Sequence, residues 1–504
     1  MHSPRGTPRV VVIGAGIGGL AAAIAVARAG LEVIIVERGP APGGKMREAV
    51  AAGRAIDSGP TVLTMRRVFD ELFDDAGAPL GDELPLRRAG VLARHAWGPD
   101  ARLDLHADVA RSSEAIGEFA GAAEARRFDA FAAAARDVYR TLEQPYLRSS
   151  RPTPLSLTWR IGLGRLGELW RIRPFKTLWS ALGGHFRDPR LRQLFGRYAT
   201  YCGSSPFHAP ATLMLVAHVE QDGVWLVEGG MQRLAEALAA LAVRLGVRIE
   251  YGASVAEILV DRGRASGVCL EDGRRLEAHA VVANADVAAF AQGLLGSQVR
   301  HAAAAVPASA RSLSAITWSL VARAEGFPLL RHNVFFSGDY AAEFDDLFGD
   351  RRPPGSPTVY VCAQDRADAP PDGPPASERL MCLINAPATG DDPSRPSTEY
   401  ESCQERTFRQ LEQCGLRVHR EATATVITTP RDFARMFPGT GGALYGQASH
   451  GWRASFNRPG SRSRVPGLYL AGGSTHPGPG VPMAALSGRL AAASLIEDLA
   501  STAR

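Results

Sequence analysis

The first forty residues contain the feature that most constrains the fold. Residues 9–13 (RVVVI) and 31–37 (LEVIIVE) are short, apolar, β-branched runs typical of buried strands. The alanine-rich stretch between them, residues 17–30, is typical of a buried helix that ends at Gly30. The pattern predicts a strand–helix–strand unit with tight connections, and therefore an α/β fold with a parallel sheet.

The turn between the first strand and the helix carries a glycine motif. Gly14, Gly16 and Gly19 have the G-x-G-x-x-G spacing, and Glu37 follows Gly19 by 18 residues at the end of the second strand. The glycines allow a tight turn, close approach of a pyrophosphate and close helix packing, and the helix amides face the phosphate charge. An acid about 20 residues on binds the adenosine ribose, which favours FAD or NAD over NADP. A glycine turn without a nucleotide is the alternative.

Two further segments favour FAD. A glycine doublet, Gly43-Gly44, follows the unit and is accompanied by Lys45 and Arg47. Residues 465–480 (VPGLYLAGGSTHPGPG) again run from a strand into a glycine-rich loop, and a helix start near Met483 is suited to a pyrimidine edge. A long dinucleotide needs both ends held, so the sequence predicts FAD.

Composition excludes several classes of protein. The net charge of +5 is spread over 504 residues, without the basic tail that nucleic-acid binding needs. The six cysteines form no CxxC pair and no zinc-spaced cluster, so we expect no metal site and reduced thiols in a cytosolic protein. Residues 10–27 carry no charge and are long enough to span a membrane, but their glycines favour a strand, a turn and a helix.

The rest of the chain predicts two or three domains. Helices are expected near 67–77, over most of 110–200, and at 231–245, 397–414 and 483–499. Strands are expected at 248–252, 255–260, 279–283, 313–323, 357–363, 379–385 and 467–471. The ranges assigned to a discontinuous Rossmann-like FAD-binding domain are 1–75, 225–300 and 440–504. Those assigned to an inserted mixed α+β substrate domain, with a helical and membrane-contacting part, are 76–224 and 301–439.

Several motifs, taken in order, resemble a known family. They are residues 14–47 (GAGIGGLAAAIAVARAGLEVIIVERGPAPGGKMR), 56–65 (IDSGPTVLTM), 224–238 (VWLVEGGMQRLAEAL), 437–446 (FPGTGGALYG) and 465–492 (VPGLYLAGGSTHPGPGVPMAALSGRLAA). Together they resemble the phytoene desaturase-type carotenoid oxidoreductases of the FAD-dependent, amine-oxidase-like superfamily. The stretch GPTVLTMRRVFDELF, then LARHAW, then SEAIGEFAG, is similar to the methoxyneurosporene dehydrogenase or 1-hydroxycarotenoid 3,4-desaturase branch of purple phototrophic bacteria.

The resemblance implies a set of FAD contacts and a reaction. The implied contacts are Gly14, Gly16, Gly19, Glu37, Arg38, Gly44, Lys45, Val255, Gly472, Gly473 and Met483, with Gly59 and Pro60 against the flavin ring. The implied reaction removes a hydride and a proton from adjacent carbons of a 1-hydroxy or 1-methoxy acyclic carotenoid and forms a C-3,4 double bond. The electrons pass to oxygen or a quinone. Tyr201, Tyr445, His450 and His476 are candidates for a catalytic role, although packing or hydrogen bonding is the commoner use of such residues, and we name none as catalytic.

A membrane-contacting segment is also expected. Residues 159–182 contain Trp159, Trp170 and Trp179 with basic residues between them, a pattern suited to a membrane interface. A lid helix packed on the protein is the alternative. The prediction is a cytoplasmic enzyme peripherally associated with the inner membrane.

Three other functions stay open. One is an amine oxidase, although such enzymes usually carry an acid after the glycine pair of the C-terminal loop, where this chain has Ser474, Thr475 and His476. Another is a non-enzymatic prenyl or lipid escort protein on the same fold. The third is a sister carotenoid enzyme, either a phytoene desaturase, a saturase or an isomerase.

Overall fold

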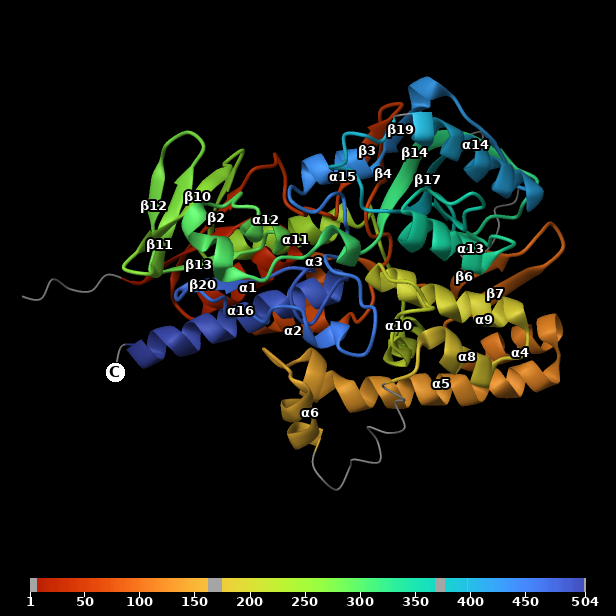
Figure 1. Ribbon diagram of the computed structural model, residues 1–504, viewed down its shortest axis with the longest axis horizontal. Coiled ribbons are helices and arrows are strands. Elements are labelled where there is room, and N and C mark those ends of the chain that lie inside the picture. Colours follow the sequence, from red (N-terminus) through yellow and green to blue (C-terminus); the bar gives the residue numbers. More distant parts are fainter. Residues whose placement is uncertain (1–6, 162–174, 368–376, 397, 503–504) are drawn as a thin grey trace, which may run out of the picture.

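A five-stranded parallel sheet forms one half of the computed structural model, which describes residues 7–161, 175–367, 377–396 and 398–502 (Figure 1). The strand order is β20-β13-β1-β2-β9. The strands are β1 (Arg9–Ile13), β2 (Glu32–Glu37), β9 (Arg248–Tyr251), β13 (Ala280–Ala283) and β20 (Leu468–Leu470). Their carboxyl ends meet at one edge of the sheet, because all neighbours run in parallel. Ligands bind at this edge in open α/β sheets.

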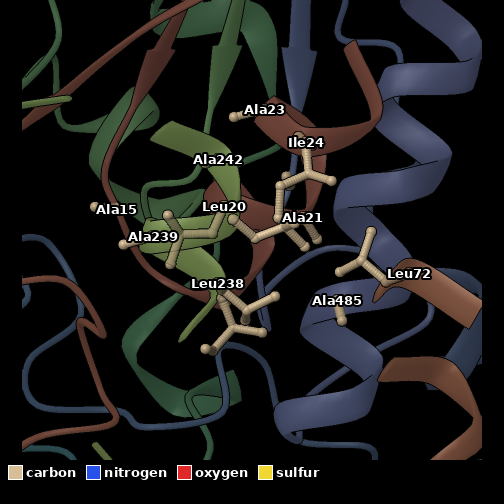
Figure 2. Packing of buried hydrophobic residues seen from close by; sticks show 14 of the residues in the cluster. Ala15, Leu20, Ala21, Ala23, Ile24, Leu72, Leu238, Ala239, Ala242 and Ala485 are labelled. Atoms are coloured by element: carbon tan, nitrogen blue, oxygen red, sulfur yellow. The ribbon is translucent and has the colours of Figure 1, made fainter. Parts of the chain in front are cut away.

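The helix after β1 lies at the centre of this half. Helix α1 (Ile17–Arg28) packs between α11 (Gln232–Arg244) and α16 (Val481–Thr502), with α2 (Arg67–Asp75) against α16 (Figure 2). Alanines on α1 allow the close approach. A Cβ on Gly488 of α16 would lie 2.1 Å from the Gly18 carbonyl oxygen, so the two helices nearly touch there. The uncharged run 10–27 is therefore strand, turn and buried helix, as predicted.

A mixed eight-stranded sheet forms the other half. The strand order is β18-β14-β17-β16-β15-β6-β7, with β19 beside β14, and only β15 and β6 pair in parallel. The strands are β6 (Val91–Ala96), β7 (Arg102–His106), β14 (Ser314–Glu325), β15 (His332–Phe335), β16 (Val359–Ala363), β17 (Glu378–Ala386), β18 (Arg417–His419) and β19 (Thr425–Thr428). Helix α14 (Thr398–Gln413) covers one face, where Phe408 meets the buried Trp318 edge-on at 5.8 Å.

A helical region packs beside the mixed sheet (Figure 1). It contains α4 (Val109–Ala120), α5 (Ala122–Leu142), α6 (Pro154–Ile161), α8 (Leu178–His185), α9 (Pro189–Gly196) and α10 (Leu215–Asp222). Phe131 lies in its core and contacts Phe186 and Phe195 with ring centroids 5.2 and 4.7 Å away. Among the described residues, no helix combines the length and apolar character of a membrane-spanning helix.

A short hairpin and two smaller sheets complete the fold. The hairpin of β3 (Glu48–Ala51) and β4 (Arg54–Asp57) packs against the mixed sheet. There the Gln364 side-chain amide accepts a hydrogen bond from the Asp57 N–H at 3.0 Å and donates one to the Asp57 carbonyl at 2.9 Å. The smaller sheets are β10 (Val255–Asp261) with β11 (Arg264–Leu270) and β12 (Arg275–Glu277), and β5 (Leu86–Arg88) with β8 (Trp225–Val227). The hairpin thus joins the N-terminal segment to the distant sheet.

The predicted elements agree with the structure where periodicity was strong. The N-terminal unit, α11, α14 and α16 lie within a few residues of their expected positions. No strands were predicted in 76–224, where β5, β6 and β7 lie. The strands β3, β4, β8, β15, β18 and β19 were also missed. The strands of the parallel sheet lie in the ranges assigned to the FAD-binding domain. The strands of the mixed sheet lie in the ranges assigned to the substrate domain. The domain boundaries themselves stay a prediction.

Candidate active site

A cavity of about 1180 Å³ is lined by the carboxyl edge of the parallel sheet, by the mixed sheet and by the helical region. Pockets for a drug-sized ligand have volumes of roughly 300–1,000 Å³. The cavity is thus larger than one compact ligand needs. It can hold an extended cofactor and a substrate together.

The turn after β1 forms the nucleotide end of this cavity. Gly14 has a φ of 93°, and both Gly14 and Gly16 line the cavity at the N-terminus of α1. A Cβ on Gly16 would lie 2.7 Å from Asn284 Nδ2, and one on Gly19 would lie 2.0 Å from the Gly14 carbonyl oxygen. Gly19 does not line the cavity. Its role is to let α1 pack against the turn, while the first two glycines keep the backbone open to a ligand.

Glu37 closes this end at the end of β2. Its Oε2 accepts a hydrogen bond from the Ala15 N–H and its Oε1 accepts one from the Gly39 N–H, both at 2.7 Å. The carboxylate is therefore fixed at the cavity wall beside the glycine turn. The residues of the predicted FAD set that line the cavity are Gly14, Gly16, Glu37, Arg38, Gly44, Lys45, Gly59, Pro60, Val255, Gly472, Gly473 and Met483.

Lys45 brings a cation to the cavity. Its Nζ donates to the Leu444 carbonyl at 2.7 Å and lies 3.9 Å from Asp286 Oδ2. Desolvation lowers the pKa of Lys45, and the charge of Asp286 partly opposes that shift. A cation in this position, together with the N-terminus of α1, suits an anionic cofactor.

The sequence analysis missed three residues of the nucleotide end. Asn284 and Asp286 follow β13, and Asn284 Nδ2 donates to the Gly14 carbonyl at 3.4 Å. Buried Arg458 donates to the carbonyls of Tyr445 at 3.0 Å, Gly473 at 3.3 Å and Gln447 at 2.7 Å, and so holds the C-terminal glycine loop. The position of Asn284 and Asp286 directly after a buried strand was a usable signal. Arg458 offered none.

The far part of the cavity is a chamber with a mostly apolar wall. Leucines and valines of α10 and its surroundings face side chains of β14 to β17 across it. Polar groups interrupt this wall, among them the Tyr360 hydroxyl, which lies 2.7 Å from both Thr61 Oγ1 and His332 Nδ1. Burial lowers the pKa of His332 to about 3, so its ring is neutral at physiological pH. The chamber suits a long apolar ligand with few polar groups.

The four candidates for a catalytic role divide into two pairs. Tyr201 and Tyr445 line the cavity. The His450 ring instead accepts from the Ser205 N–H at 3.0 Å, and its pKa is lowered to about 4 by burial and by the nearby His208. His476 Nε2 lies 2.9 Å from the Tyr146 carbonyl oxygen, and neither histidine is among the described residues that line the cavity. The two histidines hold the fold together.

The expected membrane segment is described only in part, because 162–174 lies outside the described residues. Trp179 is half-buried: its ring packs on Phe207 and Tyr340, and the Arg192 guanidinium stacks on it at 4.2 Å, so it is less available to a membrane than the sequence pattern predicts. Trp159, by contrast, is 82% exposed. A regular alternation of tryptophan and basic residues cannot distinguish these two environments.

The fold and the cavity together define an oxidoreductase of the dinucleotide-binding class. The flavin containing amine oxidoreductase family matches residues 17–496. A hydroxyneurosporene desaturase of Rubrivivax gelatinosus is 55% identical, with 100% of this chain and 96% of the relative covered, and one of Cereibacter sphaeroides is 46% identical, with 99% of each covered. An engineered putrescine oxidase has a similar structure, with a TM-score of 0.59, 14% identity and coverage of 98% of this chain and 99% of its own. That likeness concerns the fold alone.

The chain therefore belongs to the flavin containing amine oxidoreductase family. It is a flavin-dependent oxidoreductase. The flavin is consistent with a glycine turn that faces the cavity and with an acid fixed beside it.

Proposed function

We propose that this protein is an FAD-dependent carotenoid desaturase that introduces a C-3,4 double bond into 1-hydroxy or 1-methoxy acyclic carotenoids such as hydroxyneurosporene. One observation carries the proposal: the nucleotide end of the cavity continues into a long chamber with a mostly apolar wall. Full-length relatives that are 55% and 46% identical bear the name hydroxyneurosporene desaturase, which supports the choice of substrate.

The residues that would hold FAD are those of the predicted set. Glu37 suits the adenosine ribose, the N-terminus of α1 suits the diphosphate, and the loop at Gly472 and Gly473 with Met483 suits the flavin end. The fit rests on geometry: the glycine turn, the fixed Glu37 carboxylate and the C-terminal glycine loop all line one cavity. Denatured holoprotein should release FAD and not FMN on chromatography, and release of FMN would contradict the proposal.

The bound flavin supplies the acceptor for a hydride. The chain holds the polyene so that the reacting carbons face that acceptor, and the apolar wall excludes water. The second hydrogen leaves as a proton. His332 is a poor acceptor for it because burial lowers the pKa of its ring to about 3.

We propose that the carotenoid arrives from a bilayer at the edge of the cavity near Phe175 and Trp452. These rings contact each other edge-on at 5.5 Å, line the cavity, and are 67% and 40% exposed. Exposed aromatic rings at the mouth of an apolar cavity suit a membrane interface. Phe175→Ser with Trp452→Ser should lower partition into anionic liposomes several-fold. The control is Ile427→Ser, which removes an apolar side chain that is 46% exposed on β19; an equal loss in both variants would contradict the proposal.

The substrate is tested by incubating purified holoprotein with 1-hydroxyneurosporene and with phytoene in separate liposome samples. A red shift and the loss of two hydrogens with the hydroxylated carotenoid alone is the expected result. A shift with phytoene alone would place the enzyme at an earlier desaturation. Turnover of a primary amine, without either shift, would replace the proposal with an amine oxidase.

A further inference from the structure

A positively charged side chain lies in the mostly apolar wall of the chamber. Arg197 begins the short 3₁₀ turn Arg197–Cys202, lines the cavity, and donates from Nη1 to the Tyr201 hydroxyl at 3.1 Å. Within the described residues this is its one hydrogen bond, and no carboxylate lies within the 4.0 Å of an ion pair. A guanidinium has five N–H donors. Arg197 is half-buried at the cavity wall, and its remaining donors have no acceptor among the described residues, so the geometry favours a ligand oxygen here.

The acid whose charge acts on Arg197 is already engaged. Glu220 of α10 lines the same cavity, and its Oε2 accepts from the Tyr198 hydroxyl at 2.6 Å. Its charge acts on Arg197 from a distance rather than through a direct contact. The charge on Arg197 is thus balanced without all of its donors being satisfied.

Arg197 is connected to the flavin side of the cavity along two paths. Its guanidinium lies 5.6 Å from the centre of the Tyr360 ring, and the Tyr360 hydroxyl bonds to Thr61, which directly follows Gly59 and Pro60. On the other side, a Cβ on Gly203 would lie 2.4 Å from the Tyr445 ring, and Arg458 bonds the carbonyls of both Tyr445 and Gly473. These contacts connect the cation to residues that are expected beside the flavin ring.

The chemistry of the proposed substrate requires a polar contact near the flavin. Only C-1 and C-2 separate the oxygen on C-1 from C-3, where a hydrogen is removed. A group that binds this oxygen must therefore lie beside the reacting carbons. A guanidinium donates but cannot accept, so it suits a hydroxyl and a methoxyl oxygen equally, whereas a carboxylate would suit the hydroxyl alone.

We propose that Arg197, oriented by Tyr201, binds the C-1 oxygen of the carotenoid and so places C-3 and C-4 against the flavin. The inference rests on the proposed function. The proposed contact makes Arg197 a determinant of specificity. A carotenoid without the C-1 oxygen gives the remaining donors of the guanidinium no acceptor. Sites that form a hydrogen bond to a polar substrate group reject analogues that lack this group.

The experiment compares wild-type holoprotein with Arg197→Met. We would measure kcat/KM for 1-hydroxyneurosporene and 1-methoxyneurosporene in liposomes, and the binding of neurosporene, which lacks the oxygen, by quenching of tryptophan fluorescence. Loss of a hydrogen bond to a charged group lowers kcat/KM for both oxygenated substrates roughly 10- to 100-fold. Binding of neurosporene should stay within about threefold, since the substitution keeps an apolar wall.

Arg192→Met is the matched control. Arg192 lies on α9, stacks on Trp179, and donates to the Trp179 carbonyl at 3.1 Å. Arg192 is not among the described residues that line the cavity. In Arg192→Met, kcat/KM for the two oxygenated substrates and the binding of neurosporene should therefore stay near their wild-type values.

The outcomes separate this inference from the proposed function. If wild-type protein converts neither oxygenated substrate, the proposed function fails and the role of Arg197 fails with it. Only the inference fails if wild-type protein converts the oxygenated substrates and Arg197→Met leaves kcat/KM for them unchanged. It also fails if Arg197→Met weakens neurosporene binding as strongly as it lowers kcat/KM for the oxygenated substrates. Should Arg197→Met not fold, Tyr201→Phe carries the test, with a selective loss of roughly threefold to tenfold expected because the guanidinium loses its orienting partner; an unselective loss would overturn the inference.

Discussion

The nucleotide end of the cavity is made mainly of backbone, whereas the chamber is made of side chains. At the nucleotide end, Gly14 and Gly16 line the cavity at the start of one helix, and these residues are close in sequence. In the chamber, Thr61, Arg197 and Tyr360 come from three distant segments and meet only in the folded protein. A site of the first kind should fail as a whole when one glycine changes. A site of the second kind should lose function in steps.

The largest expected effect is at Gly19. In Gly19→Ala the new methyl group would meet the Gly14 carbonyl oxygen at 2.0 Å, so α1 must shift away from the turn. Overpacking of this kind costs about 1–3 kcal/mol and lowers flavin affinity roughly tenfold or more. The ratio of flavin absorbance to protein absorbance in the purified variant measures the loss of flavin. Gly81→Ala is the control, because nothing lies within 4 Å of a Cβ there; retention of flavin in Gly19→Ala would break the comparison.

A smaller effect is expected in the chamber. Tyr360→Phe removes the hydroxyl that lies 2.7 Å from both Thr61 and His332 and leaves both side chains without this partner. We expect kcat/KM to fall roughly tenfold while flavin content stays unchanged. Tyr251→Phe is the control, since Tyr251 is 40% exposed on β9. Loss of flavin from Tyr360→Phe would show that the chamber and the nucleotide end of the cavity do not act independently.

The pH dependence of stability gives a third test of the chamber. Burial raises the pKa of Glu343 from 4.5 to about 7, against hydrogen bonds from Thr358 and Ser337 that lower it. The folded state then holds a proton that the unfolded state releases, so this group's contribution to stability falls as pH rises from about 4.5 to about 7. Glu343→Gln should remove that fall, which is on the order of 1–3 kcal/mol.

The measurement is urea unfolding of wild type and Glu343→Gln at pH 5 and pH 8. The difference between the two proteins isolates Glu343, because the buried His95 and His332 have pKa values of about 3 and oppose the trend equally in both. Parallel pH profiles would mean that Glu343 is ionised in the folded protein.

The smallest effect is expected far from both ends. Asp108 caps α4, where its Oδ1 accepts from the Ala110 N–H at 2.8 Å. Asp108→Ala should cost about 1 kcal/mol in the free energy of unfolding. Flavin content and kcat/KM should be unchanged. A change in flavin content or in kcat/KM would show that the outer helices also contribute to function, which would contradict the division into nucleotide end and chamber.

The sequence was most informative where local geometry requires one residue type. Gly14, Gly16, Gly19 and Glu37 could be identified because the turn, the helix start and the strand end lie within one contiguous unit. Lys45 and the loop at Gly472 and Gly473 followed from the same reasoning. Each of these residues, apart from Gly19, lines the cavity.

The sequence could not place residues whose role depends on distant partners. Arg458 lies in an irregular segment, and only the folded chain shows it bonded to three carbonyls. Trp179 looked like an interfacial residue, but contacts with Phe207 and Tyr340 leave it half-buried. The strands β6 and β15 pair with each other across more than 200 residues of chain, a contact that no local sequence pattern records.

The sequence alone therefore determined the class of the fold, the glycine turn and the kind of cofactor that such a turn suits. These depend on backbone conformations that few residues other than glycine adopt, and so they leave a local record. Tertiary structure alone decided the chamber. Its wall assembles from β14, β16, β17 and α10 through long-range packing. Only the fold decides which acceptors lie near the Arg197 guanidinium in that wall.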